Sequence, residues 1–398
     1  MMKYDLIVVG GGIVGIATAF RFQARHADFR ILLLEKESAV ARHQSGHNSG
    51  VIHAGVYYAP GSLKAQLCRK GAQMIKDFCR DNGIGFEECG KLIVATDEVE
   101  RQRLQGLRER ATANGIPFSE VSGEELKTRE PLIRGVEALF FPESSIVDYA
   151  EVARHMAERF VAAGGEILLG ARVDGIRETK DSVTVTTGGQ TYQADRLIAC
   201  AGAQSDRLAR LAGLKTNFRI VPFRGEYYEV DPRLRPKINH LIYPVPDPDL
   251  PFLGIHLTHE VGNRLSVGPN AVLGLSREGL PRFSVNLKDC FDILTFGGFW
   301  RFLKGNLGSG LSELRNSLFT SVYLQACRKY MPSLERRDLG RRKAGVRAQV
   351  IMDDGSVMHD FLVMQTDRMV HICNAPSPAA TSSLAIAEHI LENYLKDQ

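Results

Sequence analysis

Three glycines near the N-terminus have the spacing of a pyrophosphate-binding turn. Gly10, Gly12 and Gly15 form a Gly-x-Gly-x-x-Gly motif directly after the short apolar run 4–9. In this motif the first glycine permits a tight turn, the second lets the backbone approach the phosphates, and the third lets the next helix lie close on the strand. The N-terminus of that helix then presents free backbone N–H groups to the phosphate charge.

An acidic residue follows at the distance that a ribose requires. Glu35 lies twenty positions after Gly15 and ends the apolar run 31–34. A carboxylate at this place accepts both hydroxyls of an adenosine ribose, and its charge repels the extra phosphate of NADP. The sequence therefore predicts a dinucleotide site rather than a bare structural turn, but the spacing alone does not separate FAD from NAD.

A polar loop comes next in the chain. Residues 41–55 hold four hydroxyl or amide side chains, three histidines and three glycines. Such a loop can bring backbone donors to the phosphates and the flat ring of a cofactor, whereas the alternative is a solvated surface loop. Its position directly after the dinucleotide motif favours the cofactor interpretation.

One histidine far along the chain is a further candidate for chemistry. His256 alternates with apolar neighbours in the segment 252–257, so it points to one face of a predicted strand. A core histidine is the usual explanation of this pattern, and a catalytic histidine is the alternative.

These residues must be positioned by an interrupted cofactor fold and a second sheet. The runs 4–9 and 31–34 are predicted as buried parallel strands around a helix from Ile13 to about Arg25. A second small-residue turn, at 201–202, is expected to close around the same dinucleotide. From 216 to 280 the pattern changes to strand-like segments with several prolines, which predicts a mixed sheet that forms the floor of a substrate pocket.

Helical periodicity and capping residues predict the remaining long elements. Helices are expected at 62–82, 98–114, 124–130 and 148–163, and a last helix at 384–395. Thr381 or Ser382 is expected to cap the last helix. Its N-terminus then offers a positive dipole end, which near a flavin stabilises a reduced anionic ring.

The segment 290–314 is aromatic, basic and amphipathic, and it contains the only tryptophan of the chain, Trp300. A helix that lies at a membrane interface fits this composition. A helix that covers the substrate domain fits it equally well.

Composition limits the class of protein. The 398 residues suffice for two domains, and the net charge of +4 is a mild basic bias without the concentrated face of a nucleic-acid-binding protein. The seven cysteines form no C-x-x-C pair and no zinc spacing, so we expect reduced thiols, no metal and a cytoplasmic location. No apolar run is long enough to predict a transmembrane helix.

The chain resembles the D-amino-acid-oxidase-like superfamily of FAD oxidoreductases, and within it the L-2-hydroxyglutarate oxidase/dehydrogenase family. The resemblance runs nearly end to end. The motifs that carry it are residues 45–55, 57–58, 60–65, 223–228, 268–271 and 374–380.

The resemblance implies an α/β fold with a Rossmann-like FAD-binding domain, in which helices cover a parallel central sheet. This domain is interleaved with an α+β substrate domain built on a mixed, largely antiparallel sheet. The implied boundaries are 1–85, 148–215 and 340–398 for the FAD-binding domain, and 86–147 and 216–339 for the substrate domain.

FAD is therefore the expected cofactor. The motif and the resemblance together assign its binding to Gly10, Gly12, Ile13, Val14, Gly15, Glu35, Lys36, Ser45, His47, Asn48, Ser49, Gly50, Val51, Val173, Ala201, Gly202, Gly345, Arg347, Pro378, Ala379, Ala380, Thr381 and Ser382.

The implied reaction is the oxidation of L-2-hydroxyglutarate to 2-oxoglutarate. A base removes the hydroxyl proton while hydride passes from C2 to flavin N5, and a histidine with a pKa near neutrality suits that proton. We expect His256 to be the base and His53 to be the runner-up. Flavin positioning or covalent attachment are other roles for His53.

A substrate with two carboxylates needs two cationic or donor-rich ends. Arg347 is the candidate for the C1 carboxylate, because the superfamily often places its arginine in a Gly-hydrophobic-Arg segment. The usual proline after that arginine is Ala348 here. Arg224 and Tyr243 are expected helpers, although Arg224 fits a structural ion pair with Glu226 equally well.

Electrons are expected to pass to a membrane quinone or to oxygen, with peripheral contact of 290–314 at the inner face of the cell membrane. One alternative is a sibling FAD enzyme that acts on another hydroxy acid, an amino acid or glycerol 3-phosphate. More remote alternatives are a flavin-dependent RNA-modifying protein, which the scattered charges disfavour, and a flavin-bound assembly protein without turnover. No nucleic-acid partner is predicted.

Overall fold

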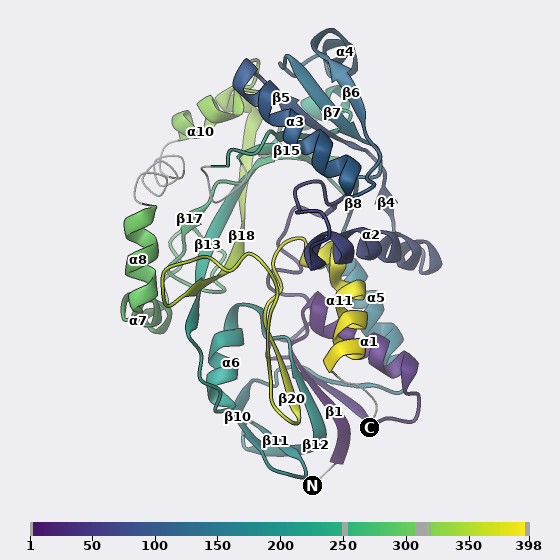
Figure 1. The fold of residues 1–398 in the computed structure, drawn as a ribbon, viewed down its shortest axis with the longest axis vertical. Coiled ribbons are helices and arrows are strands. Elements are labelled where there is room, and N and C mark those ends of the chain that lie inside the picture. The colour runs from purple at the N-terminus through teal and green to yellow at the C-terminus, as the bar shows by residue number, and fades with distance from the viewer. Residues whose placement is uncertain (1–2, 249–253, 307–316, 318–319, 395–398) are drawn as a thin grey trace.

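Two large sheets organise the residues that the computed structural model describes, which are 3–248, 254–306, 317 and 320–394 (Figure 1). The first sheet lies towards the two termini, and the second lies at the other end of the molecule. The elements of each sheet come from several separate parts of the chain, so the two halves are interleaved as expected.

Within the described residues, eight strands form the first sheet. Parallel pairing joins β9, β2, β1, β12 and β20, and antiparallel strands extend the sheet at β10, β11 and β19. The bounds are β1 (Lys3–Val9), β2 (Ile31–Leu34), β9 (Glu166–Leu168), β10 (Val173–Glu178), β11 (Val183–Thr187), β12 (Gln190–Ala199), β19 (Leu362–Gln365) and β20 (Met369–Asn374).

β1 is buried on both faces, as its apolar sequence predicts. Leu6 and Val8 belong to a core that includes residues of four helices, whereas Ile7 and Val9 face a second core on the other side. The four helices are α1 (Ile13–Arg25), α2 (Leu63–Asp81), α5 (Tyr149–Ala162) and α11 (Ala379–Tyr394). Figure 1 shows that α11, at the end of the chain, lies beside α1 and α2 from its beginning.

Nine of the described strands form the second sheet, which is mostly antiparallel. Its order is β17, β13, β16, β15, β14, β5, β7 and β6, and β18 pairs along β13. The bounds are β5 (Lys91–Ala95), β6 (Ser119–Ser122), β7 (Glu137–Phe141), β13 (Phe218–Val230), β14 (Leu241–Pro244), β15 (His256–Glu260), β16 (Arg264–Gly268), β17 (Val272–Leu273) and β18 (Leu339–Met352).

Smaller elements connect the two sheets. A short sheet contains β3 (Val51–Ile52), β8 (Ser145–Val147) and β4 (Phe86–Glu87). Further helices are α3 (Glu98–Ala113), α4 (Gly123–Arg129), α6 (Ser205–Leu211) and α10 (Thr320–Cys327). Short 3-10 turns lie at Gly202–Gln204, Pro232–Lys237 and Arg336–Asp338. The N-cap predicted at Ser62 is present, since its side chain accepts a backbone N–H group of α2. The side chains of Asp97 and Asp148 cap α3 and α5 in the same way.

The segment expected as one helix at 290–314 forms two. α7 (Leu287–Leu294) and α8 (Gly297–Gly305) are separated at Thr295 and Phe296, and residues 307–314 lie outside the described part. Two glycines at the start of α8 disfavour a continuous helix. Phe299 and Phe302 pack on the second sheet, so α8 covers that domain.

The last helix begins five residues earlier than predicted, at Ala379. Thr381 and Ser382 therefore lie inside its first turn and do not cap it. The strand β18 also departs from the expected division, because residues 340–352 lie in the second sheet although 340–398 was assigned to the cofactor domain. The domain boundaries themselves remain a prediction. None of the described helices is both long and apolar enough to cross a membrane.

Candidate active site

The turn between β1 and α1 requires two of its three glycines for packing. Gly10 has a φ of 109°, and a Cβ there would lie 2.3 Å from the carbonyl oxygen of Cys200. A Cβ on Gly15 would lie 2.0 Å from the carbonyl oxygen of Gly10. A Cβ on Gly12 would meet only the Ser45 hydroxyl, at 3.4 Å. Gly12 therefore leaves open the space that a ligand's phosphates need at the helix N-terminus.

Glu35 is held at the end of β2 by two backbone groups. One carboxylate oxygen accepts the N–H of Gly11 at 2.6 Å, and the other accepts the N–H of Glu37 at 2.8 Å. The side chain is thus fixed beside the glycine turn, and its remaining lone pairs can accept ribose hydroxyls.

The polar loop folds back onto the N-terminus of α1. The Ser45 hydroxyl accepts the N–H of Ile13 at 2.9 Å. The Asn48 side chain stiffens the loop, because its amide donates to the carbonyl of Ser45 at 2.8 Å and its oxygen accepts the N–H of Gly50 at 2.8 Å. This loop therefore forms a wall of the site.

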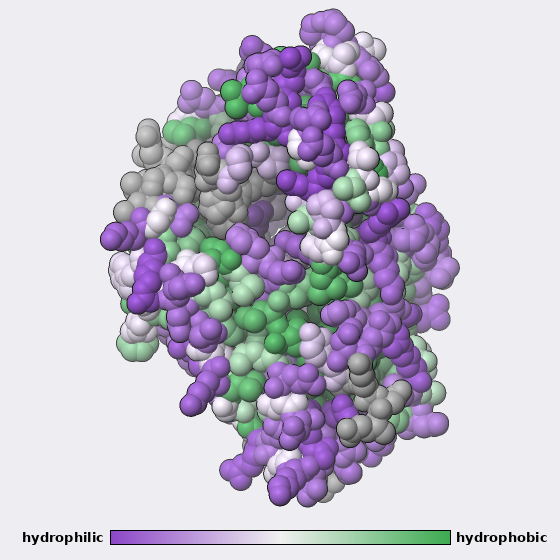
Figure 2. All heavy atoms as spheres, in the orientation of Figure 1, coloured by the Kyte–Doolittle hydropathy of each residue, from purple (hydrophilic) through white to green (hydrophobic). Residues whose placement is uncertain are grey.

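A single long cavity of about 1910 Å³ joins this turn to the second sheet. Ligand pockets commonly measure roughly 300–1,000 Å³, so the space suits a long cofactor together with a substrate. Figure 2 shows this face of the molecule hollowed near its centre. The predicted residues that line the cavity are Gly10, Gly12, Ile13, Val14, Gly15, Glu35, Lys36, Ser45, His47, Asn48, Ser49, Val51, His53, Val173, Ala201, Gly202, Tyr243, His256, Gly345, Arg347, Pro378, Ala379, Ala380 and Thr381.

Three predicted residues lie outside that lining. Gly50 supports the loop through its bond to Asn48, and Ser382 packs against α2, where a Cβ on Gly71 would meet its backbone at 2.5 Å. Arg224 is buried and points elsewhere. Its guanidinium lies 3.4 Å from the Glu226 carboxylate and donates to the carbonyls of residues 280 and 281, the latter at 2.6 Å. The ion-pair alternative for Arg224 is therefore the arrangement observed.

His256 stands on the face of the second sheet that lines the cavity. Its ring stacks on Tyr243, with 4.0 Å between ring centroids. Its Nδ1 lies 3.0 Å from the carbonyl oxygen of Gly254, which can only accept, so Nδ1 carries the proton and Nε2 is left as the basic nitrogen. Burial lowers the pKa of His256 to about 3, and the charges of Arg347 and Lys91 act in the same direction against the raising effect of Gly254.

His53 also lines the cavity, near the end of the polar loop. Its backbone N–H donates to the hydroxyl of Thr381 at 3.2 Å, and its carbonyl accepts the thiol of Cys68 at 3.3 Å. Burial lowers its pKa well below the usual histidine value, with Lys91 and His256 adding to the effect. Both histidines are thus neutral at physiological pH, and neither has the near-neutral pKa that was expected of the base.

Arg347 lies on β18 opposite Phe223 of β13. It is half-buried, lines the cavity, and forms a side-chain hydrogen bond with Tyr227. Two positions earlier, a Cβ on Gly345 would lie 2.4 Å from the carbonyl oxygen of His47. This close approach brings Arg347 next to the polar loop.

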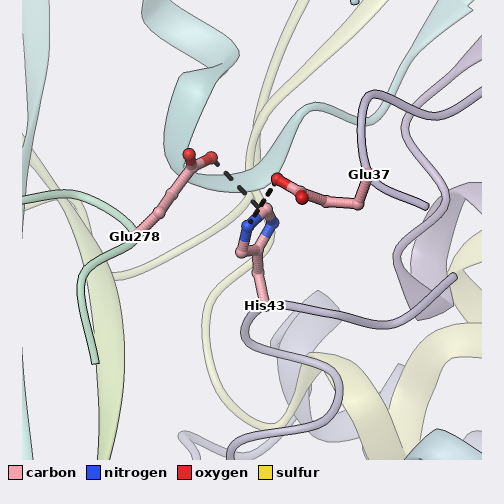
Figure 3. Close-up of side chains that lie close together, drawn as sticks. All are labelled: Glu37, His43 and Glu278. Carbon is pink, nitrogen blue, oxygen red and sulfur yellow. Dashed lines mark ion pairs between the residues drawn. The ribbon is translucent and has the colours of Figure 1, made fainter. Parts of the chain in front are cut away.

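An ion-pair cluster closes the other end of the cavity. Glu37, His43 and Glu278 point toward one another, with His43 Nε2 3.2 Å from Glu37 and Nδ1 3.9 Å from Glu278 (Figure 3). Lys36 donates to both carboxylates, at 3.0 Å to Glu278. Burial by itself lowers the pKa of Lys36, but these carboxylates raise it above its usual value. Lys36 therefore supplies the cation of this cluster and ties the 36–43 loop to the 276–279 segment.

Sequence reasoning missed several residues of the site. Tyr57, Tyr227, Lys64 and Arg110 also line the cavity, and Lys91 lies behind it. Lys64 belongs to a motif that carried the resemblance, which was the available signal. Lys91 begins an apolar strand, so its pattern resembled that of an ordinary core strand.

The protein residues fit a dinucleotide with a ring system at its far end. The open face of Gly12, the carboxylate of Glu35 and the length of the cavity suit the adenosine and pyrophosphate part. The polar loop, the start of α11 and the strand β18 surround the space nearer to His256. Comparisons with known proteins agree with this fit.

The chain matches the family model described as FAD dependent oxidoreductase over residues 5–393. It is 50% identical over 390 residues to L-2-hydroxyglutarate dehydrogenase of Escherichia coli O17:K52:H18, which covers 98% of this chain and 92% of that protein. It is 40% identical over 408 residues to the mitochondrial L-2-hydroxyglutarate dehydrogenase of Homo sapiens, covering 98% of this chain and 88% of the human protein.

Two solved structures share the fold. L-alpha-glycerophosphate oxidase from Mycoplasma pneumoniae with FAD bound has a TM-score of 0.78 at 23% identity, covering 98% of this chain and 94% of the other. Glycine oxidase from Geobacillus kaustophilus has a TM-score of 0.73 at 19% identity, covering 100% and 96%. At these identities the likeness concerns the fold alone.

Proposed function

We propose that this chain, which belongs to the FAD-dependent oxidoreductases and within them to the L-2-hydroxyglutarate dehydrogenases, oxidises L-2-hydroxyglutarate to 2-oxoglutarate. One observation carries the proposal. A single cavity connects the dinucleotide turn with a neutral histidine, His256, and an arginine, Arg347. A hydroxy acid bound at that end has a base for its hydroxyl and a guanidinium for its carboxylate.

Bound FAD supplies the acceptor for the hydride that leaves C2 of the substrate. The chain supplies the proton acceptor and the orientation. Nε2 of His256 takes the hydroxyl proton, because Nδ1 is occupied by the carbonyl of Gly254. His53, which also lines the cavity, is the second candidate for this role.

Arg347 binds the C1 carboxylate. A guanidinium fork matches a carboxylate with two parallel hydrogen bonds, which fixes C2 relative to the base. Tyr227 and Tyr243 flank this end of the cavity and limit the space for the substrate. We also propose that the other residues assigned to the cofactor from the sequence hold FAD where they line the cavity.

The electrons pass on to a membrane quinone or to oxygen. Exposed apolar side chains on and before α7 and α8 support contact with the inner face of the cell membrane. Leu287, Phe291 and Trp300 are 82%, 69% and 51% exposed. Such side chains next to the basic residues Arg301 and Lys304 suit peripheral binding to an anionic lipid surface.

Product analysis with an acceptor panel tests this function. The purified yellow protein is incubated with L-2-hydroxyglutarate and with oxygen, a soluble quinone analogue or NAD, and 2-oxoglutarate is quantified. We expect turnover with the quinone analogue or oxygen and none with NAD. Turnover only with glycine or glycerol 3-phosphate would assign the protein to a sibling activity.

A further inference from the structure

Three cations surround two consecutive tyrosines beside the reaction site. The Lys64 ammonium lies 4.8 Å from the ring centroid of Tyr58, and the Lys91 ammonium lies 5.2 Å from that of Tyr57. The guanidinium of Arg110 donates to the carbonyl of Tyr57 at 3.2 Å. Lys64, Arg110 and both tyrosines line the cavity, whereas Lys91 lies behind the rings.

No carboxylate among the described residues forms an ion pair with any of these cations. Within the described part of the chain, Lys64 donates a hydrogen bond only to the carbonyl of His359, at 3.3 Å, and the nearby charge of Asp360 partly offsets the lowering of its pKa by burial. Lys91 is fully buried, and its ammonium has no hydrogen-bond partner in the described part of the chain. Lys76 provides the contrast, since this buried lysine donates to Glu88 and to the carbonyl of Glu143, both at 2.8 Å.

An unpaired buried cation is costly, and proteins usually provide it with a counter-charge. Burial lowers the pKa of Lys91 to about 8, so the ammonium is still mainly protonated at neutral pH. The excess of positive charge at this end of the cavity therefore favours a ligand that brings a negative group.

The sheet places this charge next to the base. In the register of β14 between β5 and β15, Lys91, Tyr243 and His256 point to the same face, with Tyr243 between the other two. Tyr243 stacks on His256 at 4.0 Å, and Lys91 lies 5.0 Å from the Tyr243 ring. A substrate held by Arg347 at one carboxylate therefore extends past His256 toward the tyrosines.

We propose that Lys64 and Arg110 bind the second carboxylate of a dicarboxylate hydroxy acid, and that Lys91 is the counter-charge behind the tyrosine rings. This inference rests on the proposed function and adds the residues that select a diacid over a monoacid. Arg224, which was expected to help in substrate binding, does not line the cavity and bonds to the carbonyls of residues 280 and 281 instead.

The test compares two substrates that differ only at the distal group. Anaerobic flavin reduction is followed by stopped flow with L-2-hydroxyglutarate and with L-2-hydroxypentanoate, in which a methyl group replaces the distal carboxylate. The measured quantity is the ratio of the two second-order rate constants. In the unmodified protein we expect this ratio to exceed about 10, the typical effect of a charge-assisted hydrogen bond.

Lys64→Met is expected to reduce that ratio by roughly 10- to 100-fold, mainly through weaker binding of the diacid. Arg110→Met gives a second, independent variant of the contact residues. Lys64→Arg retains the charge and should keep most of the preference. Lys70→Met is the matched control, because Lys70 lies on the same helix and pairs with Glu388 at the surface.

Lys91→Met tests the counter-charge. We expect the ratio of the two rate constants to fall about tenfold, because a charge interaction of one pKa unit changes an equilibrium tenfold. Lys76→Met is its control and should leave the ratio unchanged. A purely structural role of Lys91 would slow the reaction with both substrates equally and overturn this part of the inference.

The results of these experiments distinguish a failure of the proposed function from a failure of the proposed carboxylate subsite. If L-2-hydroxyglutarate does not reduce the flavin of the unmodified protein, the proposed function fails. If it does, but the Lys64 and Arg110 variants keep the original ratio, the function stands and the carboxylate subsite is wrong. An unmodified protein that reacts equally with both acids also overturns the subsite.

Discussion

The imidazole of His256 is held by a stacked tyrosine on one side and a backbone carbonyl on the other. These contacts fix the ring plane and the tautomer, so that a single nitrogen can serve as the proton acceptor. In the proposed mechanism, Nδ1 positions the ring and Nε2 accepts the proton.

His256→Gln should slow anaerobic flavin reduction by L-2-hydroxyglutarate by about 10²- to 10⁴-fold, the usual contribution of a general base. The flavin content should stay the same, since the ring contacts a substrate-side tyrosine. His53→Gln, measured in parallel, identifies the base if it has the larger effect. Unchanged reduction in the His256 variant would remove His256 from the mechanism.

The positions of candidate residues were predictable where they depend on local spacing. Gly10, Gly15 and Glu35 act within one βαβ unit, so their spacing alone fixes their geometry. For Arg224 the sequence left the observed ion pair with Glu226 as one of two alternatives, because its partners at 280 and 281 reach it only through the folding of a distant segment. Lys91 was missed because a single lysine at the start of an apolar strand usually leaves its ammonium in solvent.

At the scale of elements, the polar loop and β18 must approach each other closely. The carbonyl of His47 lies where a Cβ of Gly345 would be. The loop therefore depends on a glycine that is almost three hundred positions away in the chain.

Gly345→Ala is expected to displace the polar loop and to weaken FAD binding, because the clash costs about 1–3 kcal/mol. The dissociation constant of FAD, measured by titration of the apoprotein, should rise by roughly 5- to 150-fold. Gly340→Ala on the same strand is the control, since its Cβ would have its nearest neighbour at an ordinary 3.4 Å. Equal FAD affinity in the two variants would contradict this role of Gly345.

The helices α7 and α8 have a buried side and an exposed apolar side. Phe291→Ser and Trp300→Ser should weaken flotation with anionic liposomes while the melting temperature changes little. Phe299→Ser should instead destabilise the fold by about 3–5 kcal/mol, because Phe299 is only 3% exposed. Full flotation of the Phe291 and Trp300 variants would show that this surface does not contact the membrane.

The predicted helix starts agree with the structure where a capping side chain is present, as at Ser62 and Asp148. The start of α11 was misplaced because residues 379–383 are small and polar, a composition typical of a loop. In the structure their small size lets α11 pack closely on α2, with Gly71 against Ser382. Tertiary packing here outweighs local preference.

At the scale of the whole molecule, the fold class and its interleaving were predictable from the alternation of patterns. The order of the second sheet was not. β13 and β18 pair along most of their length although more than a hundred residues separate them. Local sequence contains no signal for such a pairing, and it is this pairing that places Arg347 at the cavity.

Buried histidines should make the protein sensitive to acid. Burial lowers the pKa of His256 to about 3 and of His259 and His371 to about 4. A depressed pKa favours the neutral form in the folded state, so this stability is present above about pH 6.5 and is lost as the pH falls toward 4.

The free energy of unfolding should therefore decline between pH 6.5 and 4.5, by up to about 1.4 kcal/mol per pH unit for each histidine. Chemical denaturation across this range measures the slope. His371→Leu, a change outside the cavity lining, should remove the contribution of one histidine, which is up to about 1.4 kcal/mol per pH unit. An identical slope in this variant would show that His371 is not neutral in the folded protein.

The most direct measurement is the anaerobic reduction of the purified yellow protein by single substrates. We predict that L-2-hydroxyglutarate bleaches the flavin absorption completely and yields one 2-oxoglutarate per flavin, whereas the D-enantiomer, glycine and glycerol 3-phosphate do not. Retention of the yellow colour with L-2-hydroxyglutarate, together with bleaching by one of the other compounds, would contradict the proposed function.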